Sequence, residues 1–212
     1  MVDFNFSSDT TTTGLFVEGD DINFSDIELE ESDSSTSESS MSGELISGSS
    51  SDDIIVSLDD NDTIEGQEGD DVLSSVEGNN YLKGNLGNDT LTGGGLGFED
   101  GEIFITADAE EIDTLSGGEN SDHFILGGRS HPILDEDSET IVHYDEEGND
   151  DYAVITDFEP VEDVILLGGS EDDYRLVYSG TSSDLYVDDE LIAIIQGDAQ
   201  LSLSESYFQY QE

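Results

Sequence analysis

Acidic and amide side chains recur every nine positions between residues 39 and 92. The sixth place of each nine-residue step holds Glu44, Asp53, Asp62, Asp71, Asn80 and Asp89. Calcium is a hard cation that takes about 6–8 oxygen ligands from carboxylates, amides and backbone carbonyls. The small and polar residues before the sixth place allow sharp turns that aim carbonyls at a common point. The sequence therefore predicts a row of calcium sites.

An apolar residue occupies the eighth place of the same six steps. These residues are Ile46, Ile55, Ile64, Leu73, Leu82 and Leu91. With 33% hydrophobic residues in the chain, such a column has a chance of about one in a thousand. A fixed short period predicts a solenoid, because one repeat alone cannot bury its apolar face.

The first place of the steps alternates between serine and glycine. In order, it holds Ser39, Gly48, Ser57, Gly66, Ser75 and Gly84. This alternation predicts that two steps form one coil of 18 residues. Asp53, Asp71 and Asp89 then line one edge of the stack, and Glu44, Asp62 and Asn80 line the other. Stacked carboxylates repel each other, so cation binding and folding are expected to be one equilibrium.

The composition supports a chain that folds only when cations neutralise it. Its 212 residues include 55 acidic and three basic residues, with a formal net charge of −52. Low hydrophobicity combined with such a charge is typical of chains that stay disordered in plain water. Nucleic acid and anionic membranes are not expected as partners, because phosphate binding needs clustered Lys and Arg. The lack of cysteine excludes disulfides and thiolate metal sites.

The chain divides into three predicted regions. Residues 1–38 combine apolar patches at period-two spacing with an acidic, serine-rich linker, and the patches could supply a strand to a neighbouring copy. Residues 39–128 form the repeat array, which a glycine-rich insertion near 93–107 interrupts. A strand is expected at 102–107 within that insertion. Residues 129–212 are predicted to form an antiparallel β cap, and the sequence gives no shape for 129–149.

The nine-residue register returns after the insertion, at Asp113 with Leu115 and at Asp122 with Phe124. In the cap, YAVITDF and VEDVILL are expected as strands of an antiparallel unit. DLYV and ELIAIIQG flank Asp188 and Asp189 and predict a hairpin. No helix is expected anywhere, so the fold class is all-β.

The repeats resemble the G-G-x-G-x-D-x-U-x pattern of RTX proteins, most closely in GQEGDDVLS and GNLGNDTLT. The resemblance covers most of residues 39–128 and 150–210. It implies a parallel β-roll with several Ca²⁺ ions between its turns, and export through a type I channel that reads an uncleaved C-terminal signal. The metal-site residues that it adds to the sixth-place set are Gly66, Gly69, Gly84, Gly87, Asn88, Asp113, Asp122, Asp157 and Asp163. Departures from the pattern predict weaker or absent sites at Glu44 and Asn80.

Catalytic motifs are absent from the sequence. His123, His131 and His143 lack the spacing of a metal triad, and no G-x-S-x-G or H-E-x-x-H motif occurs. About 40 residues precede the array, which is too few for a catalytic domain, so no enzymatic activity is expected. The N-terminus lacks a Sec-type signal peptide, and no apolar run has the length of a membrane helix.

These features predict a secreted calcium-binding structural protein of the cell surface or extracellular matrix. It would fold on calcium, and its partners would be other copies of itself or a cell-surface polysaccharide. A second interpretation is a soluble calcium reservoir or a mineral-nucleating acidic protein, in which the charge itself is the function. A third, less favoured interpretation is a polysaccharide-active enzyme.

Overall fold

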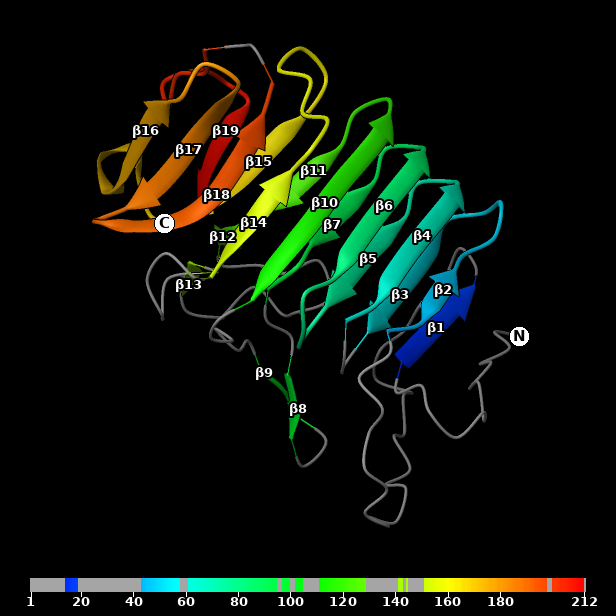
Figure 1. Ribbon diagram of the computed structural model, residues 1–212. Coiled ribbons are helices and arrows are strands. Elements are labelled where there is room, and N and C mark those ends of the chain that lie inside the picture. Colours follow the sequence, from blue (N-terminus) through cyan, green and yellow to red (C-terminus); the bar gives the residue numbers. More distant parts are fainter. Residues whose placement is uncertain are drawn as a thin grey trace.

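The computed structural model is an all-β fold built on two stacked sheets (Figure 1). The residues that it describes are 14–18, 43–57, 61–94, 97–99, 102–104, 111–128, 141–142, 144, 151–197 and 200–211. One short 3-10 turn, η3 (Glu171–Asp173), is the only helical element among them. No helix in this described part is long and apolar enough to cross a membrane.

Alternate strands of the chain enter alternate sheets, as expected for a β-roll. The seven-stranded sheet has the order β1 (Gly14–Glu18), β3 (Asp53–Ser57), β5 (Val72–Ser75), β7 (Thr90–Thr92), β11 (His123–Ile125), β15 (Val164–Gly168) and β19 (Phe208–Gln211). The eight-stranded sheet has the order β16 (Tyr174–Tyr178), β17 (Ser182–Val187), β18 (Glu190–Gln196), β14 (Tyr152–Ile155), β10 (Ile112–Glu119), β6 (Tyr81–Leu86), β4 (Thr63–Glu68) and β2 (Leu45–Ser47). The predicted parallel roll of 18-residue coils is therefore confirmed.

The eighth-place residues form the core between the two sheets. In the seven-stranded sheet, parallel pairing aligns Ile55, Leu73, Leu91, Phe124, Ile165 and Phe208. In the eight-stranded sheet it aligns Ile46, Ile64, Leu82, Leu115, Ile155 and Ile195. All of these side chains are buried except that of Ile46, which is partly buried. Each coil thus buries one apolar residue per sheet against its neighbours, which explains why the repeat needs the stack.

Two insertions leave the roll without breaking its register. Asn80 and Asp113 lie in adjacent coils although they are 33 positions apart instead of 18, so fifteen extra residues are accommodated. The antiparallel pair β8 (Gly97–Glu99) and β9 (Glu102–Phe104) belongs to this first insertion and includes part of the strand expected at 102–107. The second insertion, between β11 and β14, includes β12 (Gly127–Gly128) and β13 (Ile141–Val142), which also pair antiparallel.

The C-terminal region only partly follows the prediction of an antiparallel cap. β17 and β18 form the predicted hairpin, and β16 pairs antiparallel with β17. The expectation that YAVITDF and VEDVILL belong to an antiparallel unit is wrong, because β14 lies parallel to β10, and β15 lies parallel to β11. The core columns continue through Ile155 and Ile165, so these strands gain more by extending the roll than by pairing with each other.

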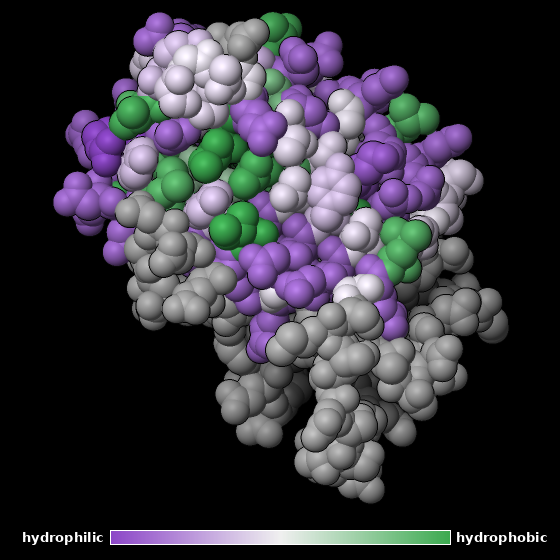
Figure 2. Space-filling view, in the orientation of Figure 1, coloured by the Kyte–Doolittle hydropathy of each residue, from purple (hydrophilic) through white to green (hydrophobic). Residues whose placement is uncertain are grey.

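Other strands cover the opposite end of the stack. β1 pairs antiparallel with β3 and ends the seven-stranded sheet there, and Figure 1 shows it at the far end from β16–β19. β2 ends the eight-stranded sheet beside β4. Figure 2 shows a face on which hydrophilic side chains predominate and hydrophobic ones gather in small areas. Exposed Leu45 and Leu86 are among the apolar residues outside the core.

Candidate metal centre

Five sixth-place aspartates form a continuous ladder along one edge of the roll, called here the first edge. They are Asp53, Asp71, Asp89, Asp122 and Asp163. In each rung, the backbone N–H of one aspartate donates to Oδ1 of the aspartate in the next coil, at 2.8–3.0 Å. The rungs fix one oxygen of Asp71, Asp89, Asp122 and Asp163, while Asp53 at the end of the ladder accepts the N–H of Ser49 with its Oδ2. Except for Asp163, the ladder aspartates are at most 1% exposed.

The other carboxylate oxygen of the first four aspartates has no hydrogen-bond donor among the described residues. These atoms are Asp53 Oδ1, Asp71 Oδ2, Asp89 Oδ2 and Asp122 Oδ2. A buried, ionised oxygen without a partner is strongly unfavourable. At Asp163 the second oxygen accepts the N–H of Glu159 at 2.8 Å, so the row of unsatisfied oxygens stops one coil before the ladder does.

Glycine at the first place leaves room beside the unsatisfied oxygens of Asp71, Asp89 and Asp122. A Cβ at Gly66 would collide with Asp71 Oδ2 and would lie 3.0 Å from the carbonyl oxygen of Gly84 in the next coil. A Cβ at Gly84 would likewise collide with Asp89 Oδ2 and lie 2.5 Å from the carbonyl oxygen of Gly117. Carboxylate and carbonyl oxygens thus converge on a space that a side chain would fill. Such an all-oxygen donor set fits calcium.

The opposite edge, called here the second edge, contains Glu44, Asp62, Asn80 and Asp113. The same kind of rung links them, with N–H to Oδ1 distances of 2.7–2.8 Å. The second oxygen is satisfied differently, because Ser57 Oγ donates to Asp62 Oδ2, and Tyr144 Oη donates to Asp113 Oδ2 at 2.9 Å. Asn80 carries no charge, and its Nδ2 donates to the carbonyls of Glu77 and Gly78. On the second edge, protein groups therefore satisfy the side chains of Asp62, Asn80 and Asp113.

Burial raises the pKa of the first-edge carboxyl groups. Desolvation brings the pKa of Asp71 and Asp122 to about 7 and that of Asp89 to about 6, against an opposing effect of the rung hydrogen bonds. Neighbouring carboxylates raise them further, as Asp89 and Asp53 do for Asp71. The pKa of Asp163 is also raised, chiefly by burial. In a chain without cations, this edge therefore holds protons near neutral pH.

Asp113 on the second edge also has a raised pKa. Burial is again the largest cause and brings the value to about 7, although the hydrogen bonds from Asn80 and Tyr144 lower it. The pKa of the Tyr144 hydroxyl lies well above its usual value because the group is buried beside Asp113. Tyr144 therefore remains a donor to Asp113 throughout the neutral range.

The fifth place of the repeat forms a second ladder, which the sequence interpretation did not include except at Asn88. Backbone N–H groups of Asp70 and Asn88 donate to Oδ1 of Asp52 and Asp70, both at 2.8 Å. On the other side of the coil, Asn79 donates to Asn61 in the same way. The signal was present, since every fifth place from residue 52 to residue 88 is Asp or Asn. These side chains are exposed. Their hydrogen bonds run from the N–H of the later coil to the side chain of the earlier one, the reverse of the sixth-place rungs.

The remaining predicted residues have distinct positions. Gly69 and Gly87 have φ angles of +119° and +149°, and a Cβ on either would collide with the backbone of the preceding coil. They shape the turn and do not present side-chain ligands. Asn88 belongs to the fifth-place ladder. Asp157 accepts the N–H groups of Gly117 and Gly118 at 3.0 and 3.1 Å, which fixes the turn next to Asp122.

Carboxylates alone do not complete a site in this arrangement. No group of three or more His, Cys, Asp or Glu side chains converges in metal-binding geometry within the described ranges. Backbone carbonyls, such as that of Gly84, must therefore supply the other ligands. A bound Ca²⁺ would neutralise the unsatisfied oxygens and connect successive coils.

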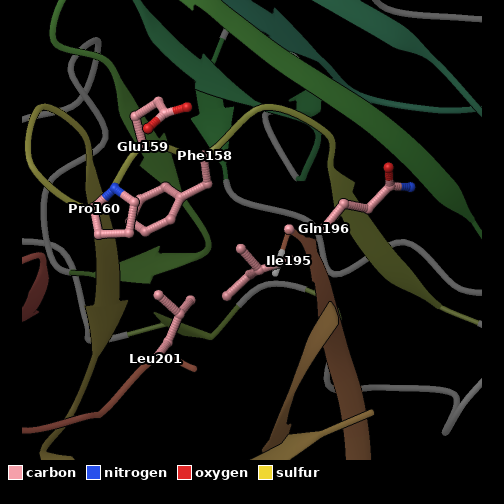
Figure 3. A pocket seen from close by; sticks show the side chains of 7 residues that line it. Phe158, Glu159, Pro160, Ile195, Gln196 and Leu201 are labelled. Carbon is pink, nitrogen blue, oxygen red and sulfur yellow. The ribbon is translucent and has the colours of Figure 1, made fainter. Parts of the chain in front are cut away.

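A hollow of about 200 Å³ lies next to the end of the roll. Figure 3 shows the side chains of Phe158, Pro160, Ile195 and Leu201 around it, while the carboxylate of Glu159 points away from them. Glu159 is the only ionisable residue in its lining. Phe158 also packs edge-on against Phe124, with ring centroids 6.2 Å apart.

A comparison with family models matches the chain to the RTX calcium-binding nonapeptide repeat, in four copies. The match covers residues 47–82 and 74–95, which include the first-edge residues Asp53, Asp71 and Asp89. The comparison with curated proteins finds no match. The matched region and the ladder geometry agree, so this 212-residue chain carries an array of RTX calcium-binding nonapeptide repeats folded as a β-roll.

Proposed function

We propose that this chain is a secreted structural protein of the cell surface or extracellular matrix that folds on calcium and then self-assembles. The observation that carries the proposal is the row of buried carboxylate oxygens without donors on the first edge. A metal-free stack must leave these oxygens unsatisfied or protonated. A calcium concentration typical of extracellular fluids would supply the missing ligand and favour the folded chain.

Self-assembly is proposed from the ends of the stack. β2 and β16 terminate the eight-stranded sheet, and neither has a further strand on its outer side among the described residues. Leu45 on β2 is 65% exposed. A sheet end with unpaired backbone groups is a template for another chain. Calcium would first lower the net negative charge from its value of −52, which otherwise keeps copies apart.

The alternative function is a soluble calcium reservoir or a mineral-nucleating protein. The observation that favours it is the exposed acid on the fifth-place ladder, at Asp52 and Asp70, which adds accessible charge outside the buried edge. Such carboxylates would bind additional cations weakly and exchange them readily. The two proposals differ in what calcium does to particle size.

Export from the cell and the lack of enzymatic activity are also parts of the proposal. A cell-surface polysaccharide is the proposed partner other than the protein itself.

Light scattering of the full chain during a calcium titration tests the structural function. We expect the particle mass to grow once the chain has folded, and we expect a chelator to reverse the growth. A matched titration with magnesium should produce less growth, because Mg²⁺ prefers octahedral sites and keeps its water. A folded chain that remains monomeric at millimolar calcium would reject self-assembly and favour the reservoir.

A further inference from the structure

The two edges of the roll have the same backbone rungs but differ in the second oxygen of each side chain. On the first edge, Asp53, Asp71, Asp89 and Asp122 each keep one buried oxygen without a donor among the described residues. On the second edge, both oxygens of Asp62 and of Asp113 accept hydrogen bonds. Among the carboxylates that the rungs link, those of the first edge therefore lack a partner for one oxygen, whereas Asp62 and Asp113 on the second edge do not.

The first place of the repeat explains this difference. On the first edge it is glycine, at Gly48, Gly66, Gly84 and Gly117, and in each case the position of a Cβ lies against the aspartate five residues later. On the second edge it is serine at Ser57 and Ser75, and glycine at Gly93 beside Asp113. Ser57 both fills the space with its Cβ and satisfies Asp62 with its hydroxyl.

Other protein groups close the rest of the second edge. Asn80 replaces a carboxylate by a neutral amide whose Nδ2 is bonded within its own turn. Tyr144, from the second insertion, is 4% exposed and places its hydroxyl 2.9 Å from Asp113 Oδ2. The same hydroxyl lies where a Cβ on Gly93 would be, so it occupies the space beside Asp113.

We propose that calcium binds along the first edge only and that hydrogen bonds hold the second edge closed without metal. This inference rests on the proposed calcium-dependent folding and specifies where the ions bind. The first-place residue, together with Tyr144 in the space beside Gly93, then determines the edge that takes cations. The roll becomes one-sided, with up to four ion positions defined by the four unsatisfied oxygens.

Replacing single aspartates by asparagine tests the inference in the full chain. Asparagine can keep the rung, as Asn80 does when its Oδ1 accepts the N–H of Asp62 at 2.7 Å. We expect Asp71→Asn and Asp89→Asn each to lose at least one tightly bound Ca²⁺, counted by equilibrium dialysis with radioactive calcium at pH 7.5. The matched variants Asp62→Asn and Asp113→Asn should bind the wild-type number.

The outcomes separate this inference from the proposed function. If the second-edge variants lose as many ions as the first-edge variants, calcium binds at both edges and the inference is wrong. If the wild-type chain takes up no calcium, the proposed function fails as well. Circular dichroism in saturating calcium shows whether each variant is folded before its ions are counted.

An exchange at the first place provides a second test should an asparagine variant not fold. Gly66→Ser would put a Cβ and a hydroxyl against Asp71 Oδ2 and is expected to remove one ion. Ser57→Gly would remove the group that closes Asp62 and is expected to remove none. A loss of calcium in Ser57→Gly, or an unchanged count in a folded Gly66→Ser, would overturn the inference.

Discussion

At the scale of single residues, identical aspartates in identical backbone positions have different chemical roles. Asp62 and Asp71 both accept a rung hydrogen bond from the preceding coil at 2.8 Å. Their remaining oxygens face a serine hydroxyl in one case and a glycine in the other. A residue five positions before the aspartate therefore decides whether the carboxylate needs a cation.

Removing the Ser57 hydroxyl should destabilise the calcium-loaded fold. Ser57→Ala leaves Oδ2 of the buried Asp62 without its donor, which costs about 1–3 kcal/mol. Ser75 is the matched control, because it occupies the same place in the next coil of this edge and its buried Oγ has no hydrogen-bond partner among the described residues. Urea unfolding in saturating calcium should show a clear loss for Ser57→Ala and little change for Ser75→Ala. Equal losses would show that Asp62 does not depend on this hydroxyl.

Protons and calcium should compete for the first edge. Burial raises the pKa of Asp71 and Asp122 from 3.8 to about 7. Below the pKa of these carboxyls in the unfolded chain, 3.8, the metal-free fold has its full stability. It loses stability as pH rises through their pKa in the folded chain, about 7, because the buried carboxyls must then ionise. With a chelator present, circular dichroism should therefore show more β structure at about pH 5 than at about pH 8.

Calcium affinity should change in the opposite direction, since the ion binds the ionised carboxylates. The midpoint of a calcium titration should move to higher calcium as pH falls from about 8 to about 5. The control is a titration of the same chain in which ionic strength is held constant. A midpoint independent of pH would show that the carboxyls of Asp71, Asp89 and Asp122 do not release protons on binding.

At the scale of the elements, the sequence predicted most of the roll. The columns at the sixth and eighth places led to the coil of 18 residues and the two edges, because each coil repeats the same contacts. The pairing of β14 and β15 was missed, since insertions of fifteen and twenty-three residues separate their register from the array. Tyr144 could not be predicted as a partner of Asp113, because no periodic pattern connects an insertion to the coil that it contacts.

The stack should depend on each buried eighth-place residue. Leu82 is fully buried and lies between Ile64 and Leu115 in adjacent strands. Leu82→Ala should cost about 2–5 kcal/mol, because the neighbouring coils leave a cavity that cannot collapse. Leu86, at the end of the same strand β6, is 44% exposed. Leu86→Ala should therefore change the free energy of unfolding by no more than about 0.5 kcal/mol. Similar urea midpoints for the two variants in calcium would contradict this core.

At the scale of the whole molecule, charge opposes the fold and calcium permits it. A net charge of −52 on 212 residues repels itself at every stage of compaction. Each coil contributes only about one apolar core residue to each sheet. The burial of this small core therefore offsets little of the charge repulsion. Cations at the first edge would neutralise the carboxylates nearest to that core.

The central claim is that calcium and folding are one equilibrium in this chain. Its most direct test is far-UV circular dichroism of the full chain at pH 7.5 during a calcium titration, with magnesium as the control ion. We predict a coil spectrum in a chelator and a cooperative change to a β spectrum as calcium reaches millimolar concentration. A spectrum that is unchanged by calcium, whether coil or β throughout, would contradict the account.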